Sequence, residues 1–193
     1  MTGHAGRFGS VVTAMVTPFR DDDHAIDLDG AQQLASWLVD NGSDAVVVAG
    51  STGESPTLSA NEKAGLFRAV GEAISGRGKL ICGTGTYSTA ETLELTEAAE
   101  EAGADGLLVV TPYYNKPPQR GLIAHFERVA DATELPIIAY NIPGRTAIRI
   151  EHDTLLTLAE RPNIVAVKDS TGDFQAVSRL IAEAPSGFEV YSG

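Results

Sequence analysis

A lysine stands at the end of an apolar run. The segment "IVAVKDSTG", residues 164–172, leads apolar residues into Lys168, and polar, turn-forming residues follow at once. One interpretation is that the lysine simply closes a strand and extends its ammonium group into water. The other is that the Lys168 amine is partly desolvated, which favours the neutral form of an amine. A neutral amine can attack a carbonyl group and form a Schiff base.

Two adjacent hydroxyl groups follow an earlier apolar run. The segment "GSTGE" places Ser51 and Thr52 between glycines, which let a backbone approach a ligand closely. Hydroxyl and backbone N–H groups in such a turn suit a carboxylate. The alternative is a hydroxyl-rich turn that leads into the next helix, because turns favour these residue types.

Two further segments place tyrosine and arginine after apolar runs. In "YNIPGRT", Tyr140 could relay a proton, and the guanidinium group of Arg145 could hold a substrate carboxylate. In "TPYYNKPP", two prolines stiffen a loop that carries Tyr113 and Tyr114. The alternatives are tyrosines that pack over a core and an arginine on the surface.

The elements that would position these side chains recur along the chain. Short, apolar, β-branched runs are each followed by a turn and an amphipathic stretch, which predicts repeated βα units with a parallel sheet. The runs span residues 10–19, 44–50, 79–85, 106–112, 136–143, 164–170 and 188–193.

The fold class predicted from this alternation is α/β. A doubly wound sheet and a (β/α)8 TIM barrel both fit, and the barrel is favoured because polar residues cluster after nearly every strand. The chain ends with its seventh strand at Gly193, whereas such a barrel typically has about 250 residues. We therefore expect residues 1–193 to form a single, incomplete barrel domain without the eighth unit and the C-terminal helices. We also expect the chain to be the first part of a longer protein.

Helix boundaries are predicted by capping residues. Ser59 with Glu62, and Ser88 with Glu91, have the spacing of a capping box. Glycines that follow amphipathic stretches predict three helix ends, at Gly42, Gly76 and Gly103.

All strand ends of a barrel lie on one face, where active sites of this fold occur. An amine, hydroxyl groups and a guanidinium group are therefore expected to converge there. The sequence predicts no metal site, because the histidines are scattered without ligand spacing. They are His4, His24, His125 and His152. The segment "GTGTYS" resembles a dinucleotide fingerprint, but Ser88 replaces its third glycine, so no nucleotide cofactor is predicted.

The composition excludes several classes of protein. The formal net charge is −12, the opposite of the balance that nucleic-acid binding or an anionic membrane surface would require. We see no signal peptide in "MTGHAGRFGS" and no apolar run of membrane-spanning length. The single cysteine, Cys82, excludes an internal disulfide framework. Together these observations predict a soluble, cytoplasmic protein.

The motifs "GSTGES", "TPYYNKP", "YNIPGRT" and "VKDSTG" together resemble the pyruvate-dependent class I aldolase family, and within it the dihydrodipicolinate synthase branch. The resemblance covers essentially the whole chain. It implies that Lys168 forms a Schiff base with pyruvate, without a cofactor, and that Tyr140 relays protons. The product of condensation with L-aspartate 4-semialdehyde would be 4-hydroxy-tetrahydrodipicolinate, in lysine and diaminopimelate biosynthesis.

The resemblance also implies roles for other residues. Thr52 would hold the pyruvate carboxylate, and Ser51 would take part in the proton relay. Arg145 would receive the carboxylate of the semialdehyde. Tyr114 would reach into the site of a neighbouring subunit, in a homotetramer.

Three departures from the family pattern leave alternatives open. Ser51 replaces the usual threonine, and serine is common there in N-acetylneuraminate lyases and 2-keto-3-deoxy-sugar-acid aldolases; Arg145 argues for the synthases. Ala60 and Lys63 replace histidines of lysine-inhibited members, which predicts weak or absent inhibition by lysine. A backbone contact to pyruvate lies beyond Gly193 in the family, so a non-catalytic chain that binds small carboxylates or intact subunits is a third interpretation.

Overall fold

The computed structural model describes residues 6–193, so His4 and the first part of the segment searched for a signal peptide lie outside the described residues. The chain divides into two compact units. The first unit consists of the described residues up to Gly83 together with Ala98–Gly106. The second unit consists of Thr84–Glu97 and Leu107–Gly193. The single domain expected from the sequence stays a prediction.

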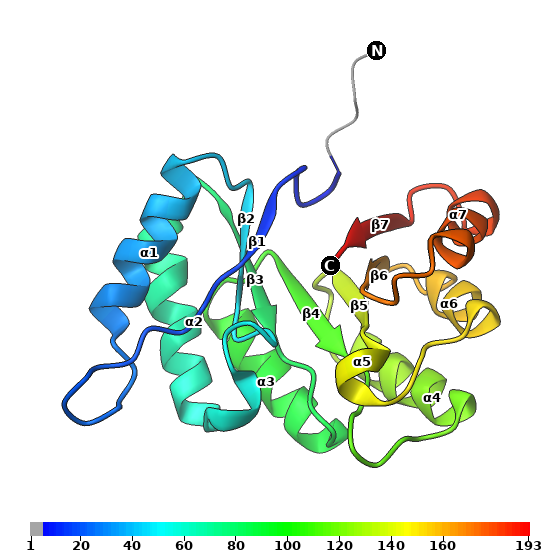
Figure 1. Cartoon of the computed structure of the whole chain (residues 1–193), viewed down its shortest axis with the longest axis horizontal. Helices are drawn as coiled ribbons and strands as arrows, with labels where there is room; N and C mark the ends of the chain where they lie inside the picture. Colours follow the sequence, from blue (N-terminus) through cyan, green and yellow to red (C-terminus); the bar gives the residue numbers. More distant parts are fainter. Residues whose placement is uncertain (1–5) are drawn as a thin grey trace. The chain divides into compact units, whose positions relative to one another are not determined.

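The first unit contains three parallel strands and their helices (Figure 1). Strand β2 pairs with both β1 and β3. Helix α1 begins after Asp27, whose carboxylate accepts a hydrogen bond of 2.9 Å from the Gly30 N–H group. The elements are β1 (Val12–Ala14), α1 (Leu28–Asp40), β2 (Ala45–Val48), η1 (Ser55–Thr57), α2 (Ala60–Ile74) and β3 (Lys79–Gly83).

The second unit contains the strands that follow. β5 pairs with both β4 and β6, and β6 pairs with β7, all in parallel. Helix α3 (Thr89–Glu101) contributes residues to both units. The remaining elements are β4 (Gly106–Val110), α4 (Gln119–Ala130), β5 (Ile137–Asn141), α5 (Pro143–Thr146), α6 (His152–Ala159), β6 (Ile164–Asp169), α7 (Phe174–Glu183) and β7 (Glu189–Ser192).

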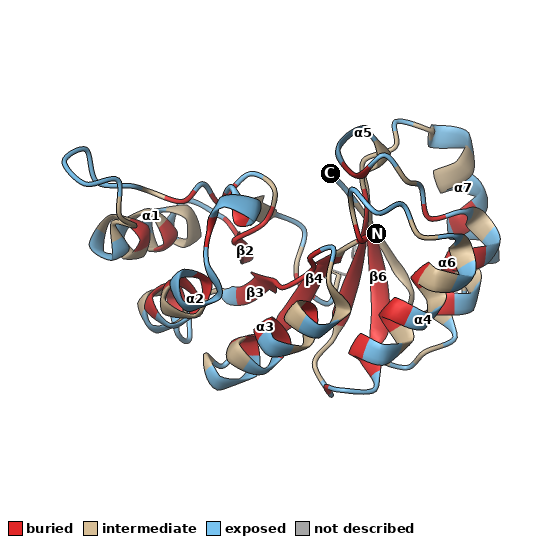
Figure 2. Ribbon diagram, turned by 90° about the horizontal axis from the view of Figure 1, so that it is seen from below, coloured by how far each residue is buried: buried red, intermediate tan, exposed pale blue. Residues whose placement is uncertain are grey.

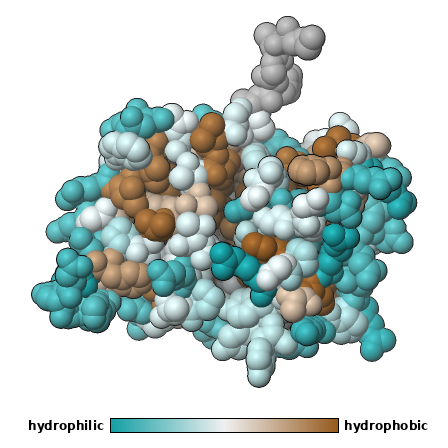
Figure 3. All heavy atoms as spheres, viewed as in Figure 1, coloured by the Kyte–Doolittle hydropathy of each residue, from teal (hydrophilic) through white to brown (hydrophobic). Residues whose placement is uncertain are grey.

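All seven predicted strands are confirmed, and the first is the shortest. Its apolar run continues past Ala14, but the chain leaves the sheet before Pro18, which has no N–H group to donate. Strands β2 and β5 are buried at every position, as expected for parallel strands that are covered on both faces. Figure 2 shows buried strands, and helices whose buried sides alternate with exposed ones. In Figure 3, apolar side chains form brown patches among the hydrophilic residues of the surface.

The predicted helix boundaries are largely confirmed. The Ser59 side chain and the Glu62 side chain form a complete capping box at α2. At α3, the Ser88 hydroxyl accepts a hydrogen bond of 3.3 Å from the Glu91 N–H group, which is one half of the predicted box. The three predicted helix-ending glycines all have positive φ: Gly42, Gly76 and Gly103.

Candidate active site

Lys168 and Tyr140 lie side by side at the C-terminal ends of β6 and β5. They are paired in the register of these parallel strands, so their side chains leave the same face. The Lys168 Nζ atom lies 4.5 Å from the centroid of the Tyr140 ring. Tyr140 is 5% exposed and Lys168 is half-buried. Among residues 6–193, the Lys168 amine has no hydrogen-bonded or ion-pair partner, so it is available to a ligand.

A one-residue shift in β6 produces this arrangement. Ile137 pairs with Ile164, but the next residue of β5, Ile138, pairs with Ala166, so Val165 is an extra residue in β6. An extra residue of this kind is a β-bulge, and it reverses the face to which every later side chain points. Without the bulge, Tyr140 would pair with Val167, and Lys168 would face the other way.

Ser170 and Gly193 also lie close to the Lys168 and Tyr140 side chains. The Ser170 hydroxyl lies 3.5 Å from the Tyr140 hydroxyl. A Cβ atom placed on Gly193 would lie 2.7 Å from Lys168 Cε and would also overlap Ser170 Oγ. The absence of a side chain at Gly193 therefore leaves room for the lysine in its present conformation.

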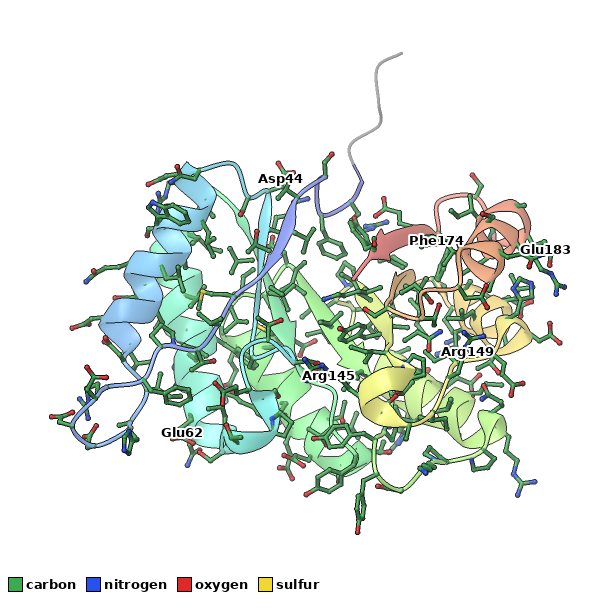
Figure 4. All side chains as sticks on the ribbon, in the orientation of Figure 1. Asp44, Glu62, Arg145, Arg149, Phe174 and Glu183 are labelled. Atoms are coloured by element: carbon green, nitrogen blue, oxygen red, sulfur yellow. The ribbon has the colours of Figure 1, made fainter. Side chains whose placement is uncertain are left out.

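Arg145 lies on the short helix α5, which begins at Pro143 directly after β5. Proline suits the first position of a helix because that N–H group would have no helical partner. The Arg145 side chain is exposed, and within the described part of the chain its guanidinium group has no hydrogen-bonded or ion-pair partner. In Figure 4, Arg145 and Arg149 lie on opposite sides of α5. Arg145 is thus free to bind an anionic group.

The "GSTGE" turn of the first unit has a strained backbone. Ala49, directly before it, and Glu54, its last residue, both have positive φ, which is uncommon for residues other than glycine. Backbone strain of this kind clusters at functional sites. Ser51 is half-buried and Thr52 is exposed, so both hydroxyl groups can be reached from solvent. Thr17 Oγ1 donates a hydrogen bond of 2.7 Å to the Gly53 carbonyl group and holds the turn in place.

Tyr114 is presented to solvent by the loop between β4 and α4. Its φ is 68°, and its side chain is 92% exposed. The loop itself is anchored, because Asn115 Nδ2 donates a hydrogen bond of 3.1 Å to the Tyr87 carbonyl group, and the Tyr87 and Tyr113 rings meet edge to face at 5.5 Å. The exposure of the Tyr114 ring thus results from an ordered loop.

The structure brings two of the six predicted site residues, Lys168 and Tyr140, into contact. Arg145 and Tyr114 belong to the same unit and lie in the segments that follow neighbouring strands. Ser51 and Thr52 belong to the other unit, so their approach to Lys168 stays a prediction.

Sequence reasoning missed three polar residues close to the lysine. Ser170 contacts Tyr140, and Asn141 and Asp169 are hydrogen-bonded to each other on the opposite face of the same strands. Asn141 directly follows Tyr140, and Asp169 and Ser170 directly follow Lys168. This closeness in sequence to predicted site residues is the signal that could have identified them.

The described residues carry neither a metal-binding cluster nor a membrane-spanning helix. No group of three or more histidine, cysteine, aspartate or glutamate side chains in residues 6–193 could hold a metal ion. None of the helices in this range has both the length and the apolar character that a membrane span requires. Cys82 is fully buried, and burial raises the pKa of its thiol.

A family model described as the dihydrodipicolinate synthetase family matches residues 7–193. The chain belongs to this family. The 4-hydroxy-tetrahydrodipicolinate synthase of Acidothermus cellulolyticus is 56% identical over 186 residues, which cover 96% of this chain and 59% of that protein. The enzyme of the same name from Moorella thermoacetica is 54% identical, over 97% of this chain and 64% of its own length. The chain thus spans less than two thirds of the length of these relatives.

Solved structures of the family agree with this assignment. A dihydrodipicolinate synthase from Bacillus anthracis superposes with a TM-score of 0.94 at 45% identity, covering 97% of this chain and 64% of that one. The synthase from Cyanidioschyzon merolae, solved with lysine bound, also gives a TM-score of 0.94, at 46% identity over 96% of this chain and 63% of its own. The predicted fold class, an incomplete (β/α)8 barrel, is confirmed.

Proposed function

We propose that the chain carries the Schiff-base chemistry of a 4-hydroxy-tetrahydrodipicolinate synthase, a lyase that condenses pyruvate with L-aspartate 4-semialdehyde. The observation that carries the proposal is the unpaired Lys168 amine at the C-terminal end of β6, beside the buried Tyr140 ring. Active sites of (β/α)8 barrels occur at this end of the strands. Relatives at 54% and 56% identity bear the name of this enzyme.

In the proposed reaction, the neutral Lys168 amine attacks C2 of pyruvate. The carbonyl oxygen takes one proton from the amine and one from Tyr140 and leaves as water, which gives an iminium ion. The iminium ion withdraws electrons, so C3 loses a proton and becomes an enamine carbon. This carbon attacks the aldehyde carbon of the semialdehyde, and the aldehyde oxygen takes up a proton. The substrate amine then attacks C2 and displaces Lys168, which closes the ring and restores the free amine. The lysine thereby supplies the activation that a cofactor supplies in other enzymes.

We assign the remaining roles by chemistry. Tyr140, with its hydroxyl group close to Ser170, moves protons to and from the reacting atoms. Ser51 extends this relay, and Thr52 binds the pyruvate carboxylate. The unpartnered guanidinium group of Arg145 binds the carboxylate of the semialdehyde, for which its planar fork is suited.

The proposal includes a homo-oligomer, a tetramer by analogy with the family, that acts in the cytoplasm without a metal ion or organic cofactor. The support for the oligomer is Tyr114, whose ring is 92% exposed on an anchored loop. An exposed aromatic side chain in an ordered loop can enter the site of a neighbouring subunit, and there Tyr114 would complete the proton relay.

Borohydride trapping tests the proposal. Folded protein is incubated with pyruvate and borohydride, and the peptides are analysed by mass spectrometry. We expect a reduced pyruvate adduct on Lys168 that is lost in Lys168→Arg and retained in Lys116→Arg, which alters a lysine of the loop between β4 and α4 in the same unit. If folded wild-type protein forms no adduct on Lys168, the proposal fails, and a non-catalytic chain that binds small carboxylates or intact subunits becomes the better interpretation.

Ser51 favours a second candidate function, that of an N-acetylneuraminate lyase or 2-keto-3-deoxy-sugar-acid aldolase. Both reactions begin with the same adduct, so trapping does not distinguish them. Consumption of the semialdehyde, compared with cleavage of the sugar acids, does. Preferential cleavage of a sugar acid would assign the chain to the second function.

A further inference from the structure

Asn141 and Asp169 form a second side-chain pair on β5 and β6, one residue beyond Tyr140 and Lys168. The register pairs Asn141 with Asp169, and Asn141 Nδ2 donates a hydrogen bond of 3.3 Å to Asp169 Oδ2. Because side chains alternate between the faces of a strand, this pair lies on the face opposite to the lysine and tyrosine. One face of the strand ends thus carries Lys168 and Tyr140, and the other carries the hydrogen-bonded Asn141 and Asp169.

Asn141 also holds the segment that follows α5. Its Nδ2 group donates to the Ile150 carbonyl group at 3.2 Å, and its Oδ1 atom accepts from the Ile150 N–H group at 3.0 Å. The side chain is 2% exposed. A buried amide with all these bonds holds a single orientation, because any rotation would leave buried polar groups unpaired.

Asp169 connects the same pair to the turn before α7. Its Oδ1 atom accepts hydrogen bonds from the Thr171 N–H group at 3.0 Å and from Thr171 Oγ1 at 2.6 Å. Thr171 Oγ1 in turn accepts from the Asp173 N–H group, and Asp173 caps α7 by accepting from the Ala176 N–H group. The end of β6 is therefore joined to β5 on one side and to α7 on the other.

We propose that Asn141 and Asp169 are positioning residues, which hold the shifted register of β6 so that Lys168 and Tyr140 face each other. The inference rests on the proposed Schiff-base function for its consequence, but its geometry is independent of the substrate. The bulge at Val165 leaves two registers open to the end of β6, and only the shifted one pairs Asn141 with Asp169. In the unshifted register Asn141 would meet Lys168, and the amide would lose its carboxylate partner.

The hydrogen bond between Asn141 and Asp169 lies beside a cavity. A cavity of about 150 Å³ adjoins it, with Asn141, Asp169 and Thr171 in its wall and Leu155 and Leu180 among the apolar residues that also line it. Shortening Asn141 would enlarge this cavity and admit water to the strand ends. Water can replace the lost hydrogen bonds, but it cannot hold the two strands in one register.

The first test measures the reactivity of Lys168 without any substrate. Wild-type protein and Asn141→Ala are labelled with acetic anhydride across a range of pH, and labelling of Lys168 is compared with that of Lys116. We expect the labelling of Lys168 to fall in Asn141→Ala at every pH, because loss of the shifted register turns the amine to the opposite face of the strands, while the Lys116 profile stays unchanged. Asn163→Ala is the matched control, because Asn163 Nδ2 bridges the Ala130 and Thr133 carbonyl groups and Asn163 directly precedes β6, at the end remote from Lys168.

The second test exchanges the partners. Asn141→Asp alone places two carboxylates against each other, whereas Asn141→Asp with Asp169→Asn restores one donor and one acceptor. We expect the single variant to lose pyruvate-adduct formation on Lys168 by on the order of a hundredfold, the cost of about 1 Å of misplacement. The double variant should recover part of this loss, because it restores the pair but not the bond from residue 141 to the Ile150 carbonyl group. A saturating pyruvate concentration should not rescue the single variant, because positioning and not binding is impaired.

The outcomes separate this inference from the proposed function. Absence of a pyruvate adduct on the wild-type protein would overturn the function, yet the labelling profiles would still test the positioning pair. An unchanged Lys168 profile in folded Asn141→Ala, or a single exchange variant that forms adduct as fast as the wild type, would overturn the positioning role. If Asn141→Ala does not fold, the comparison of folded Asp169→Ala with the wild type gives the same decision, because that substitution removes the oxygen to which the Asn141 amide donates.

Discussion

The Lys168 Nζ atom lies 4.5 Å from the centroid of the Tyr140 ring, across two neighbouring parallel strands. An aromatic face attracts an ammonium group without accepting its proton, unlike a carboxylate, which would form an ion pair. The arrangement therefore orients the amine and leaves its lone pair, once the proton is lost, free to attack a carbonyl carbon.

Tyr140→Phe separates the two contributions of this tyrosine. The ring remains beside Lys168, so we expect the pyruvate adduct to form, but loss of the hydroxyl group should lower kcat about 10²–10⁴-fold, as for loss of a general acid–base group. Steady-state kinetics and trapping on the same preparation check this. Tyr87→Phe, a change at an exposed tyrosine in the same unit, serves as the control. Normal kcat in Tyr140→Phe would refute the relay.

Arg145→Ala should affect one substrate and spare the other. Loss of a guanidinium–carboxylate interaction should raise KM for the semialdehyde, while adduct formation with pyruvate continues. Arg149→Ala is the matched variant, because this nearby arginine is paired with Asp173 at 3.3 Å. Equal effects of the two substitutions on KM would argue against a specific role for Arg145.

Gly193→Ala should disturb the lysine directly. The added Cβ atom would overlap Ser170 Oγ and lie 2.7 Å from Lys168 Cε, so the side chains around the amine must shift. We expect slower adduct formation with pyruvate in a protein that unfolds near the wild-type temperature. Gly144→Ala is the control, because a Cβ atom there would have nothing within 4 Å. Wild-type adduct formation in Gly193→Ala would show that the lysine has other productive conformations.

His125 makes the stability of the protein dependent on pH. It is 4% exposed, its Nδ1 atom is hydrogen-bonded to Thr89 Oγ1 at 2.8 Å, and among the described residues Nε2 has no partner. Burial lowers the pKa of His125 from 6.5 to about 4. Between these values the unfolded chain binds more protons, so the free energy of unfolding falls as the pH falls. The contribution is complete above pH 6.5 and is lost as the pH approaches 4.

The loss from this residue should be about 3 kcal/mol, since each tenfold difference in proton affinity corresponds to about 1.4 kcal/mol. Urea unfolding at several pH values measures it. In His125→Gln the free energy of unfolding should fall less between neutral pH and the acidic end of this range. His24→Asn is the control, because His24 is exposed and has positive φ, which asparagine tolerates. The same pH dependence in His125→Gln and wild type would assign the effect to other groups.

Inhibition by lysine is expected to be weak or absent. Ala60 is exposed and offers no polar group, and the Lys63 side chain is only 2% exposed, so neither residue supplies the imidazole group that lysine-inhibited members have at these positions. Titration of the active protein with L-lysine checks this expectation. Strong inhibition would show that other residues form an effector site for lysine, which is bound in the solved structure of the Cyanidioschyzon merolae relative.

The sequence predicted the elements because each has a local signal. Apolar runs mark the strands, the Ser59–Glu62 spacing marks a helix start, and glycines with positive φ mark helix ends. The residue types at the strand ends also pointed to Lys168 and Tyr140.

The bulge at Val165 has no such signal. Residues 164–167 are all buried, and a strand covered on both faces reads as one continuous apolar run. A run without alternation does not show which residues share a face, so the direction of Lys168 could not be read from it. The Asn141–Asp169 bond was equally hidden, because it depends on the shifted register.

The face on which Lys168 lies also depends on whether the number of residues in β6 before it is odd or even. Adding or removing a single residue between Ile164 and Lys168 moves the amine to the opposite face of the sheet, whereas a change of two residues preserves its side. Evolution can thus vary this strand in steps of two, or in single steps that create or abolish a bulge. When family members are aligned, a one-residue gap in this strand should accordingly be read as a change of backbone geometry or as the loss of the lysine to which we assign the Schiff base.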